Sequence, residues 1–110
     1  MELSPGDVVM LDVMYSDQTG MKQRPAVALT MPDANGDFLI APITTTSGLG
    51  NSTTLDAAKF AKGGLPHMSW IRADRVFIVN TTTVVKQFGT LKPEAVKEVL
   101  KILCPAIGCK

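Results

Sequence analysis

Most of the chain consists of short apolar segments separated by turn residues. Their extents are residues 8–14, 25–29, 38–43, 52–55, 70–79 and 84–88. The third segment follows Asn35-Gly36, a strong signal for a hairpin turn. Because one short strand cannot bury its apolar face alone, the segments must pack against one another. The pattern predicts a mainly β fold, a small barrel or a sandwich.

One segment near the end of the chain has helical periodicity instead. Pro93 suits the first helical turn, and Pro105 is expected to end the helix. The apolar stripe has the spacing i, i+3, i+4 and i+7 and consists of Val96, Val99, Leu100 and Leu103. The opposite face carries two pairs of opposite charge, Glu94 with Lys97 and Glu98 with Lys101. We expect a C-terminal helix over residues 95–103, packed on the strands.

Composition narrows the class of protein. The chain has 110 residues, 45% of them hydrophobic and 19% charged, which excludes a disordered protein and fits one domain over residues 1–110. The net charge of +1 gives no global attraction to a polyanion, so an anion site must be local. With 5% aromatic residues, Trp70 and Phe77 are expected in the core and not as stacking platforms. His67 is the single histidine, in a predicted loop, so no metal site or cofactor is expected.

The termini point to the cytoplasm. Residues 1–7 carry acid, Pro and Gly where a signal peptide would be basic and then apolar. No apolar run approaches the roughly 20 residues that span a bilayer, so no membrane is expected. Cys104 and Cys109 are interpreted as incidental reduced thiols, with a tail disulfide or half of a metal site as the alternatives.

Two predicted loops carry candidate chemistry. Residues 15–24 are long for a hairpin connection and contain both a carboxylate and basic side chains. Residues 44–54 are rich in hydroxyl groups and contain glycines, which suits phosphate oxygens, but no Lys-Ser or Lys-Thr pair of a P-loop follows. Taken singly, each has a plainer explanation. Arg24 could be an ordinary surface arginine, and the threonines could be strand-edge residues.

The order of these pieces is more specific than any one of them. The pieces are Gly6-Asp7 before a strand, Arg24-Pro25-Ala26, Pro42-Ile43-Thr44, and Ser69-Trp70-Ile71-Arg72-Ala73-Asp74. In this order, over nearly the whole chain, the sequence resembles the MazF/PemK family of toxin endoribonucleases from bacterial toxin–antitoxin pairs.

The resemblance implies a small SH3-like (CcdB/MazF-like) barrel with a C-terminal α-helix. It also implies a homodimer, a cognate antitoxin, and metal-independent cleavage of single-stranded RNA at short motifs. In that family the 2′-OH attacks the adjacent phosphate, and translation is inhibited. The catalytic residues implied are Arg24, Thr44 and, in the first loop, the acidic residue Asp17.

Physical chemistry assigns these residues different tasks. The guanidinium of Arg24 is permanently charged and can bind two phosphate oxygens, so it stabilises charge and does not donate a proton. The hydroxyl of Thr44, or of a neighbour, can hydrogen-bond the phosphate or orient the 2′-OH. Asp17 is the better proton acceptor. Candidates for binding the RNA are Lys22, Thr45, Thr46, Ser47, Arg72, Arg75 and Lys86.

Two other functions remain open from the sequence. One is a catalytically silent barrel of the same fold that binds an antitoxin or nucleic acid, or acts in regulation. The plainer explanation of the four candidate cations, Lys22, Arg72, Arg75 and Lys86, is a solvated face. The other is a gyrase poison sharing the fold, which would trap DNA breaks and leave RNA intact.

Overall fold

The computed structural model describes residues 2–14, 21–45 and 51–108. The elements are β1 (Asp7–Met14), β2 (Met21–Ala28), β3 (Asp37–Thr44), β4 (Ser52–Leu55), the 3-10 turn η1 (Ala57–Lys59), β5 (Phe60–Gly63), β6 (Ser69–Arg72), β7 (Phe77–Asn80), the 3-10 turn η2 (Thr81–Thr83), β8 (Val84–Leu91) and α1 (Pro93–Ile107). The mainly β fold with a C-terminal helix is confirmed.

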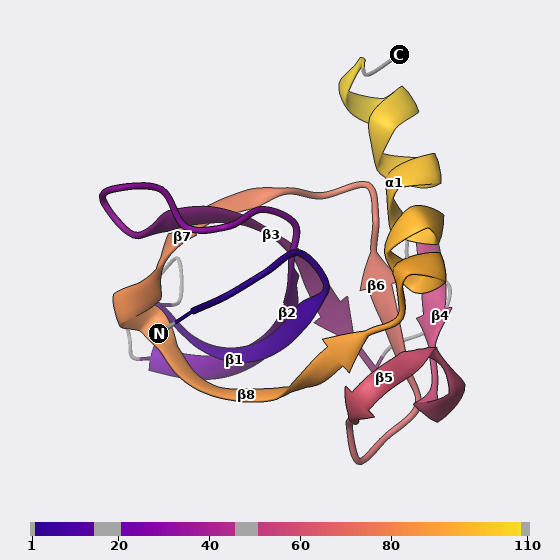
Figure 1. The fold of residues 1–110 in the computed structure, drawn as a ribbon, viewed down its shortest axis with the longest axis horizontal. Helices are drawn as coiled ribbons and strands as arrows, with labels where there is room; N and C mark the ends of the chain where they lie inside the picture. Colours follow the sequence, from indigo (N-terminus) through magenta and orange to yellow (C-terminus); the bar gives the residue numbers. More distant parts are fainter. Residues whose placement is uncertain (1, 15–20, 46–50, 109–110) are drawn as a thin grey trace.

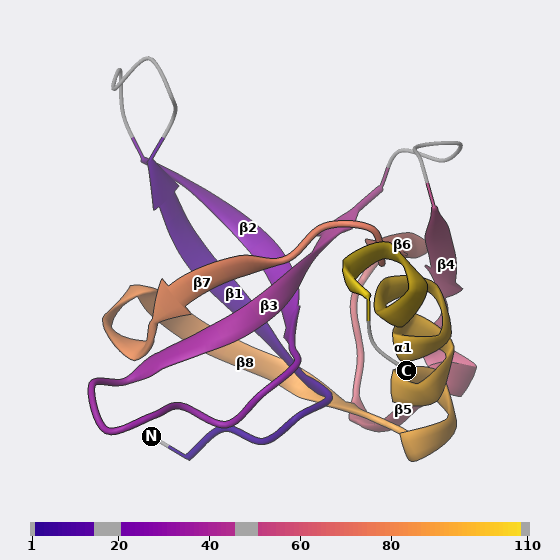
Figure 2. The same cartoon turned by 90° about the horizontal axis from the view of Figure 1, so that it is seen from above.

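The strands form one curled antiparallel sheet, in effect half a barrel (Figure 1). Its order is β4-β6-β3-β2-β1-β8-β5, and β7 pairs with β3 beside this path. Strand β3 is shared along its length. Residues 37–40 pair with β7, and residues 43–44 pair with β6. Seen from above, α1 lies beside β4 and β6, while β1 and β2 extend away from it (Figure 2).

Two clusters of buried residues lie on opposite faces of the sheet, because successive side chains of a strand point to opposite sides. The first cluster is made of Val8, Val27, Ala41, Ile43, Leu55, Phe60, Ile71, Ala73, Leu91, Ala95 and Val99. The second is made of Leu3, Val9, Leu11, Ala26, Ala28, Phe38 and Ile40. Helix α1 contributes Ala95 and Val99 to the first cluster and no residue to the second.

The strand predicted over residues 70–79 is two strands. A turn at Ala73 and Asp74 separates β6 from β7, and the Arg75 amide donates to the Arg72 carbonyl at 3.2 Å. The apolar pattern runs on through the turn because Ala73 is buried, although the chain changes its pairing from one part of β3 to another. Strand β5 was not predicted, since it has four residues and buries one side chain, Phe60.

Helix α1 is longer than predicted, and the expectation that Pro105 ends it was wrong. Pro105 lies inside the helix, where its missing N–H removes one hydrogen bond close to the end. The helix ends at Gly108, which has a left-handed φ of +84° and donates its N–H to the Cys104 carbonyl. Leu100, placed in the apolar stripe by its spacing, is 39% exposed.

The Asn35-Gly36 turn is present, with Gly36 at φ +84° and its amide bonded to the Asp33 carbonyl at 2.9 Å. Cys104 is half-buried on α1, and Cys109 lies outside the described residues. Within the described part of the chain, no helix is long and apolar enough to cross a membrane.

Candidate active site

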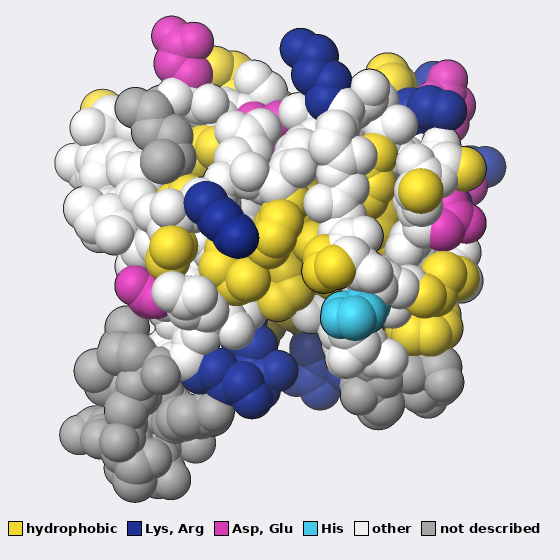
Figure 3. Space-filling model, turned by 90° about the horizontal axis from the view of Figure 1, so that it is seen from below, with side chains coloured by type: hydrophobic (Ala, Val, Ile, Leu, Met, Phe, Trp, Pro, Cys, Tyr) yellow, Lys and Arg dark blue, Asp and Glu magenta, His cyan; other side chains and the backbone are white. Residues whose placement is uncertain are grey.

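A cavity of about 500 Å³ opens beside the second core cluster. Its apolar floor includes Leu11, Ala26 and Ile40, which belong to that cluster. Its polar lining residues are Arg24, Thr44, Arg72 and Arg75. The volume falls within the roughly 300–1,000 Å³ typical of ligand sites. The space-filling view shows Lys and Arg side chains gathered along the lower edge of the molecule (Figure 3).

Arg24 reaches this cavity from within β2, not from a loop as the sequence suggested. It pairs with Leu11 of β1 and lies two residues from Ala26, so both side chains are on the same face of the sheet. Ala26 is buried in the second cluster, whereas Arg24 is exposed. Within the described residues, no carboxylate oxygen lies in ion-pair range of its guanidinium. The Arg24 guanidinium carries a permanent positive charge at the cavity.

Thr44 reaches the same cavity from the end of β3. The recorded ladder between β2 and β3 ends at the pair Ala26 and Pro42. Continued by two residues on each strand, that register brings Arg24 and Thr44 to facing positions. On its other edge β3 pairs with β6, where Thr44 lies opposite Trp70. The recorded pairing of β3 with β2 thus ends before Arg24 and Thr44, and both residues line the cavity.

The turn between β6 and β7 supplies two further arginines, Arg72 and Arg75. Arg72 donates from Nε to Oδ1 of Asp74 at 3.3 Å, and their side chains are 16% and 24% exposed. The Asn51 amide donates to the other carboxylate oxygen at 3.4 Å. The hydrogen bond from Arg72 is the main reason that the pKa of Asp74 lies below its ordinary value, and the Asn51 amide adds to it. Asp74 is therefore the anionic partner that holds the cationic side chain of Arg72.

Asp74 ends one of the motifs that carry the family resemblance, but it was not among the candidate site residues. The signal that could have found it is the spacing Arg-x-Asp, which brings the two side chains together across a turn. Asp74 also links Arg72 to Asn51, which lies in the segment predicted as the hydroxyl-rich loop.

The other candidates are spread more widely. Lys22 is exposed on β2 at the same strand parity as Arg24 but does not line the cavity. Lys86 lies on β8, away from the lining, with its ammonium 4.9 Å from the centre of the Phe88 ring. Thr45 is exposed next to Thr44. Three candidates lie outside the described residues, namely Asp17, Thr46 and Ser47.

The expectation that Phe77 lies in the core was wrong. It is 50% exposed and lines the cavity, because β7 pairs with β3 alone among the described strands. Trp70 is half-buried, and His67 is exposed between β5 and β6 as expected of a loop residue. The described residues contain no group of three or more His, Cys, Asp or Glu that could hold a metal ion.

Comparison with solved structures finds the same fold in bacterial toxins. MazF in the MazE–MazF complex (Form-III) from Deinococcus radiodurans matches with a TM-score of 0.81 and 20% identity, covering 98% of each chain. An endoribonuclease in complex with its cognate antitoxin, from a mycobacterial species, matches with a TM-score of 0.75 and 14% identity, covering 98% of this chain and 97% of that one. No curated protein sequence matches.

The family comparison covers nearly the whole sequence. The model of the PemK-like, MazF-like toxins of type II toxin–antitoxin systems matches residues 4–107. All four polar residues that line the cavity lie within this range. The chain therefore belongs to the PemK-like, MazF-like toxin family of type II toxin–antitoxin systems.

Proposed function

We propose that this toxin is a metal-independent endoribonuclease that cleaves single-stranded RNA at short sequence motifs and so inhibits translation. One observation carries the proposal: Arg24 and Thr44 line the same cavity. Arg72 and Arg75 add positive charge around the same space. Structural relatives of the same fold are described as endoribonucleases, which supports the same class of activity.

The reaction follows from the chemistry of RNA, which carries its own nucleophile beside each phosphate. The 2′-oxygen attacks the adjacent phosphorus, the bond from phosphorus to the 5′-oxygen breaks, and the leaving 5′-oxygen takes up a proton. Arg24 stabilises the charge that develops on the phosphoryl oxygens. Thr44 hydrogen-bonds the phosphate or orients the 2′-OH. Asp17 is proposed as the acceptor of the 2′-OH proton.

The same cavity offers a simple mode of inhibition. An acidic or amphipathic antitoxin segment would compete with RNA for the three arginines and the apolar floor. Relatives of this fold are known in complex with MazE or with a cognate antitoxin, which supports a partner of this kind. We propose further that the toxin is a cytoplasmic homodimer.

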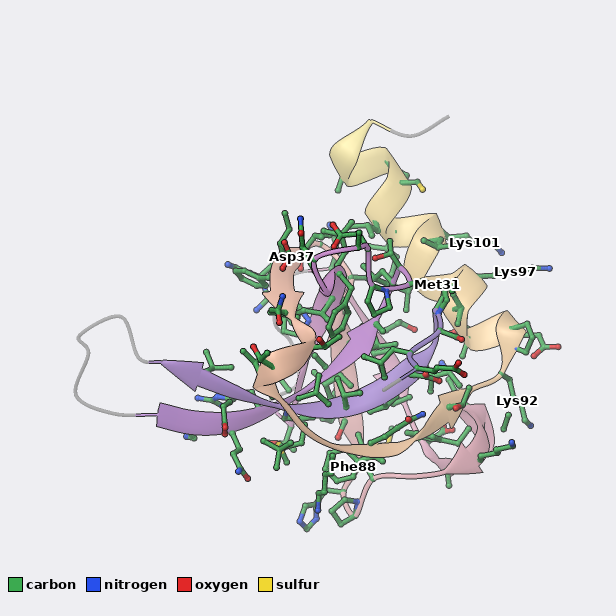
Figure 4. All side chains as sticks on the ribbon, turned by 60° about the vertical axis from the view of Figure 1, so that its left-hand side comes forward. Met31, Asp37, Phe88, Lys92, Lys97 and Lys101 are labelled. Atoms are coloured by element: carbon green, nitrogen blue, oxygen red, sulfur yellow. The ribbon has the colours of Figure 1, made fainter. Side chains whose placement is uncertain are left out.

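The test is incubation of the purified protein with a long RNA of defined sequence in EDTA. A matched control for Arg24→Ala is Lys97→Ala, since Lys97 points away from the strands on α1 (Figure 4). We expect cleavage by the wild type and by Lys97→Ala. Cleavage by Arg24→Ala should be slower by roughly a hundredfold to a thousandfold, as for loss of one transition-state donor.

Sequencing of the fragment ends would give the motif that is cut. Intact RNA with the wild-type protein would overturn the proposal and favour the silent barrel, or the gyrase poison if DNA breaks are trapped. Cleavage that stops in EDTA would overturn metal independence.

A further inference from the structure

The ring of Phe77 is an apolar group left half-exposed inside a cationic cavity. It begins β7, pairs with Ile40 of β3, and is 50% exposed. Ile40 is buried and forms part of the cavity floor. The ring therefore has a packed apolar surface behind it and open space in front of it. An aromatic side chain in this position is available to a ligand in the cavity.

The alternation of side chains along β7 explains why the Phe77 ring faces the cavity. Val79, two residues along β7, packs against the second core cluster. Phe77 has the same parity and so projects from the same side of the strand. Ile78, between them, is 72% exposed and lines both this cavity and a separate groove with Met31 and Leu39. The backbone thus directs Phe77 toward the side where Arg24, Arg72 and Arg75 lie.

The charge of the cavity decides which ligand fits. The lining combines three arginines with apolar residues that include Val13, Ile40 and Phe77. A single-stranded nucleic acid presents phosphates for the arginines and an unpaired base for the ring. Unstacked bases commonly stack on aromatic side chains, whereas bases inside a duplex are not accessible.

We propose that Phe77 is the stacking platform for one unpaired base next to the scissile phosphate, and that it selects single-stranded substrate at that nucleotide. The inference rests on the proposed ribonuclease function and extends it to substrate selection. Phe77 binds the base and takes no part in proton transfer or in bond cleavage.

The test is a thermodynamic cycle between the ring and the base. Synthetic RNAs carrying the cut site are made with an abasic nucleotide at each position flanking the cleaved bond. With intact RNA, Phe77→Ala should raise KM by about 5- to 150-fold, the range for loss of one stacked base. With one abasic RNA, and not with the others, the same variant should cause no further loss.

Two substitutions separate stacking from general apolar contact. Phe77→Trp should keep the affinity, whereas Phe77→Leu, which is apolar but has no ring, should resemble Phe77→Ala. Val85→Ala is the control, because Val85 is similarly exposed at 44% but lies on β8 outside the cavity. Normal affinity in Phe77→Leu, or an equal loss with every abasic RNA, would overturn the proposal.

Further outcomes keep this inference distinct from the ribonuclease proposal. If sedimentation shows that Phe77→Ala converts a dimer into a monomer, the ring serves a protein interface and stacking is overturned. If the wild type cleaves no RNA, the ribonuclease proposal fails, and stacking is tested by the anisotropy of a fluorescein-labelled single-stranded DNA 12-mer. Weaker binding by Phe77→Ala then supports stacking, and equal binding overturns it.

Discussion

The two faces of the curled sheet are built from adjacent residues and yet differ completely in how they are covered. Val8 belongs to the first core cluster and Val9 to the second, and the same division separates Val27 from Ala26. On the first face, α1 buries Ala95 and Val99 against the strands. On the second, the cluster reaches the surface as the floor of the arginine-lined cavity.

The two faces also differ in what their ion pairs connect. On the covered face, Lys59 binds Glu98 of α1 at 2.7 Å, and Thr53 of β4 donates to the same carboxylate at 3.1 Å. This contact joins the helix to the sheet. On the open face, Asp74 holds Arg72 beside the cavity. The difference leads us to expect that stability and proposed activity can be changed separately by substitutions on the two faces.

The largest effect is expected in the covered core. Leu91 is 3% exposed in the first cluster, and Leu91→Ala leaves a cavity there. The free energy of unfolding should fall by about 2–5 kcal/mol, measured by urea denaturation. RNA cleavage per folded molecule should be unchanged. Val85→Ala, on the exposed side of the same strand, is the control and should change stability little. A large loss of activity in folded Leu91→Ala would mean that the faces are coupled.

Thr44→Ala tests the open face. Loss of one hydrogen bond to the reacting phosphate should slow RNA cleavage by roughly a hundredfold to a thousandfold. The thermal midpoint should change little, because Thr44 lies at the end of its strand. Thr82→Ala, an exposed threonine in η2, is the control. If Thr44→Ala is active and Thr45→Ala is not, the catalytic hydroxyl belongs to the neighbour. Unfolding of Thr44→Ala would give this residue a structural role.

Asp74→Asn tests whether Arg72 is positioned by its partner. The amide keeps an acceptor for the Arg72 Nε but loses the charge. We expect kcat to fall about tenfold, comparable to loss of a charge-assisted hydrogen bond. KM should not rise, because the cavity becomes more positive. Stability at neutral pH should fall slightly, because Arg72 and the Asn51 amide stabilise the charged carboxylate in the folded protein. Glu94→Gln on α1 should change neither kinetic parameter. A rise in KM with constant kcat would contradict positioning.

Local periodicity correctly predicted those elements in which the regularly spaced apolar residues are also the ones that pack in the structure. The stripe through Val96, Val99 and Leu103 gave the correct helix because that face is the one that contacts the sheet. Phe77 and Leu100 were misplaced because burial depends on a partner elsewhere in the chain. Phe77 lies on β7, a strand with one described neighbour. In the same way, Glu98 forms its ion pair with Lys59 of η1 instead of with the expected Lys101.

The candidate site was less accessible to local reasoning. Neither the spacing between Arg24 and Thr44 nor their residue types show that two strands bring them to one cavity. Family resemblance suggested the pair, and the register of β2 and β3 explains it. The partner of Arg72 could not be placed without the turn at Ala73 and Asp74, which was hidden because residues 70–79 start by alternating and end apolar, as in one strand.

Glu98→Gln tests the ion pair of the covered face and should have the smallest effect. The hydrogen bond from Lys59, followed by that from Thr53, holds the pKa of Glu98 below its ordinary value of 4.5. A lowered folded-state pKa adds stability above the unfolded value, and this contribution is lost as the pH falls through the folded value. The side chain is 47% exposed, so the loss at pH 7 should be at most about 1 kcal/mol. The wild type and Glu98→Gln should therefore differ in urea denaturation at pH 7 and converge well below pH 4.5, with equal RNA cleavage. A difference that persists undiminished in acid would show that the carboxylate charge does not stabilise α1 on the sheet.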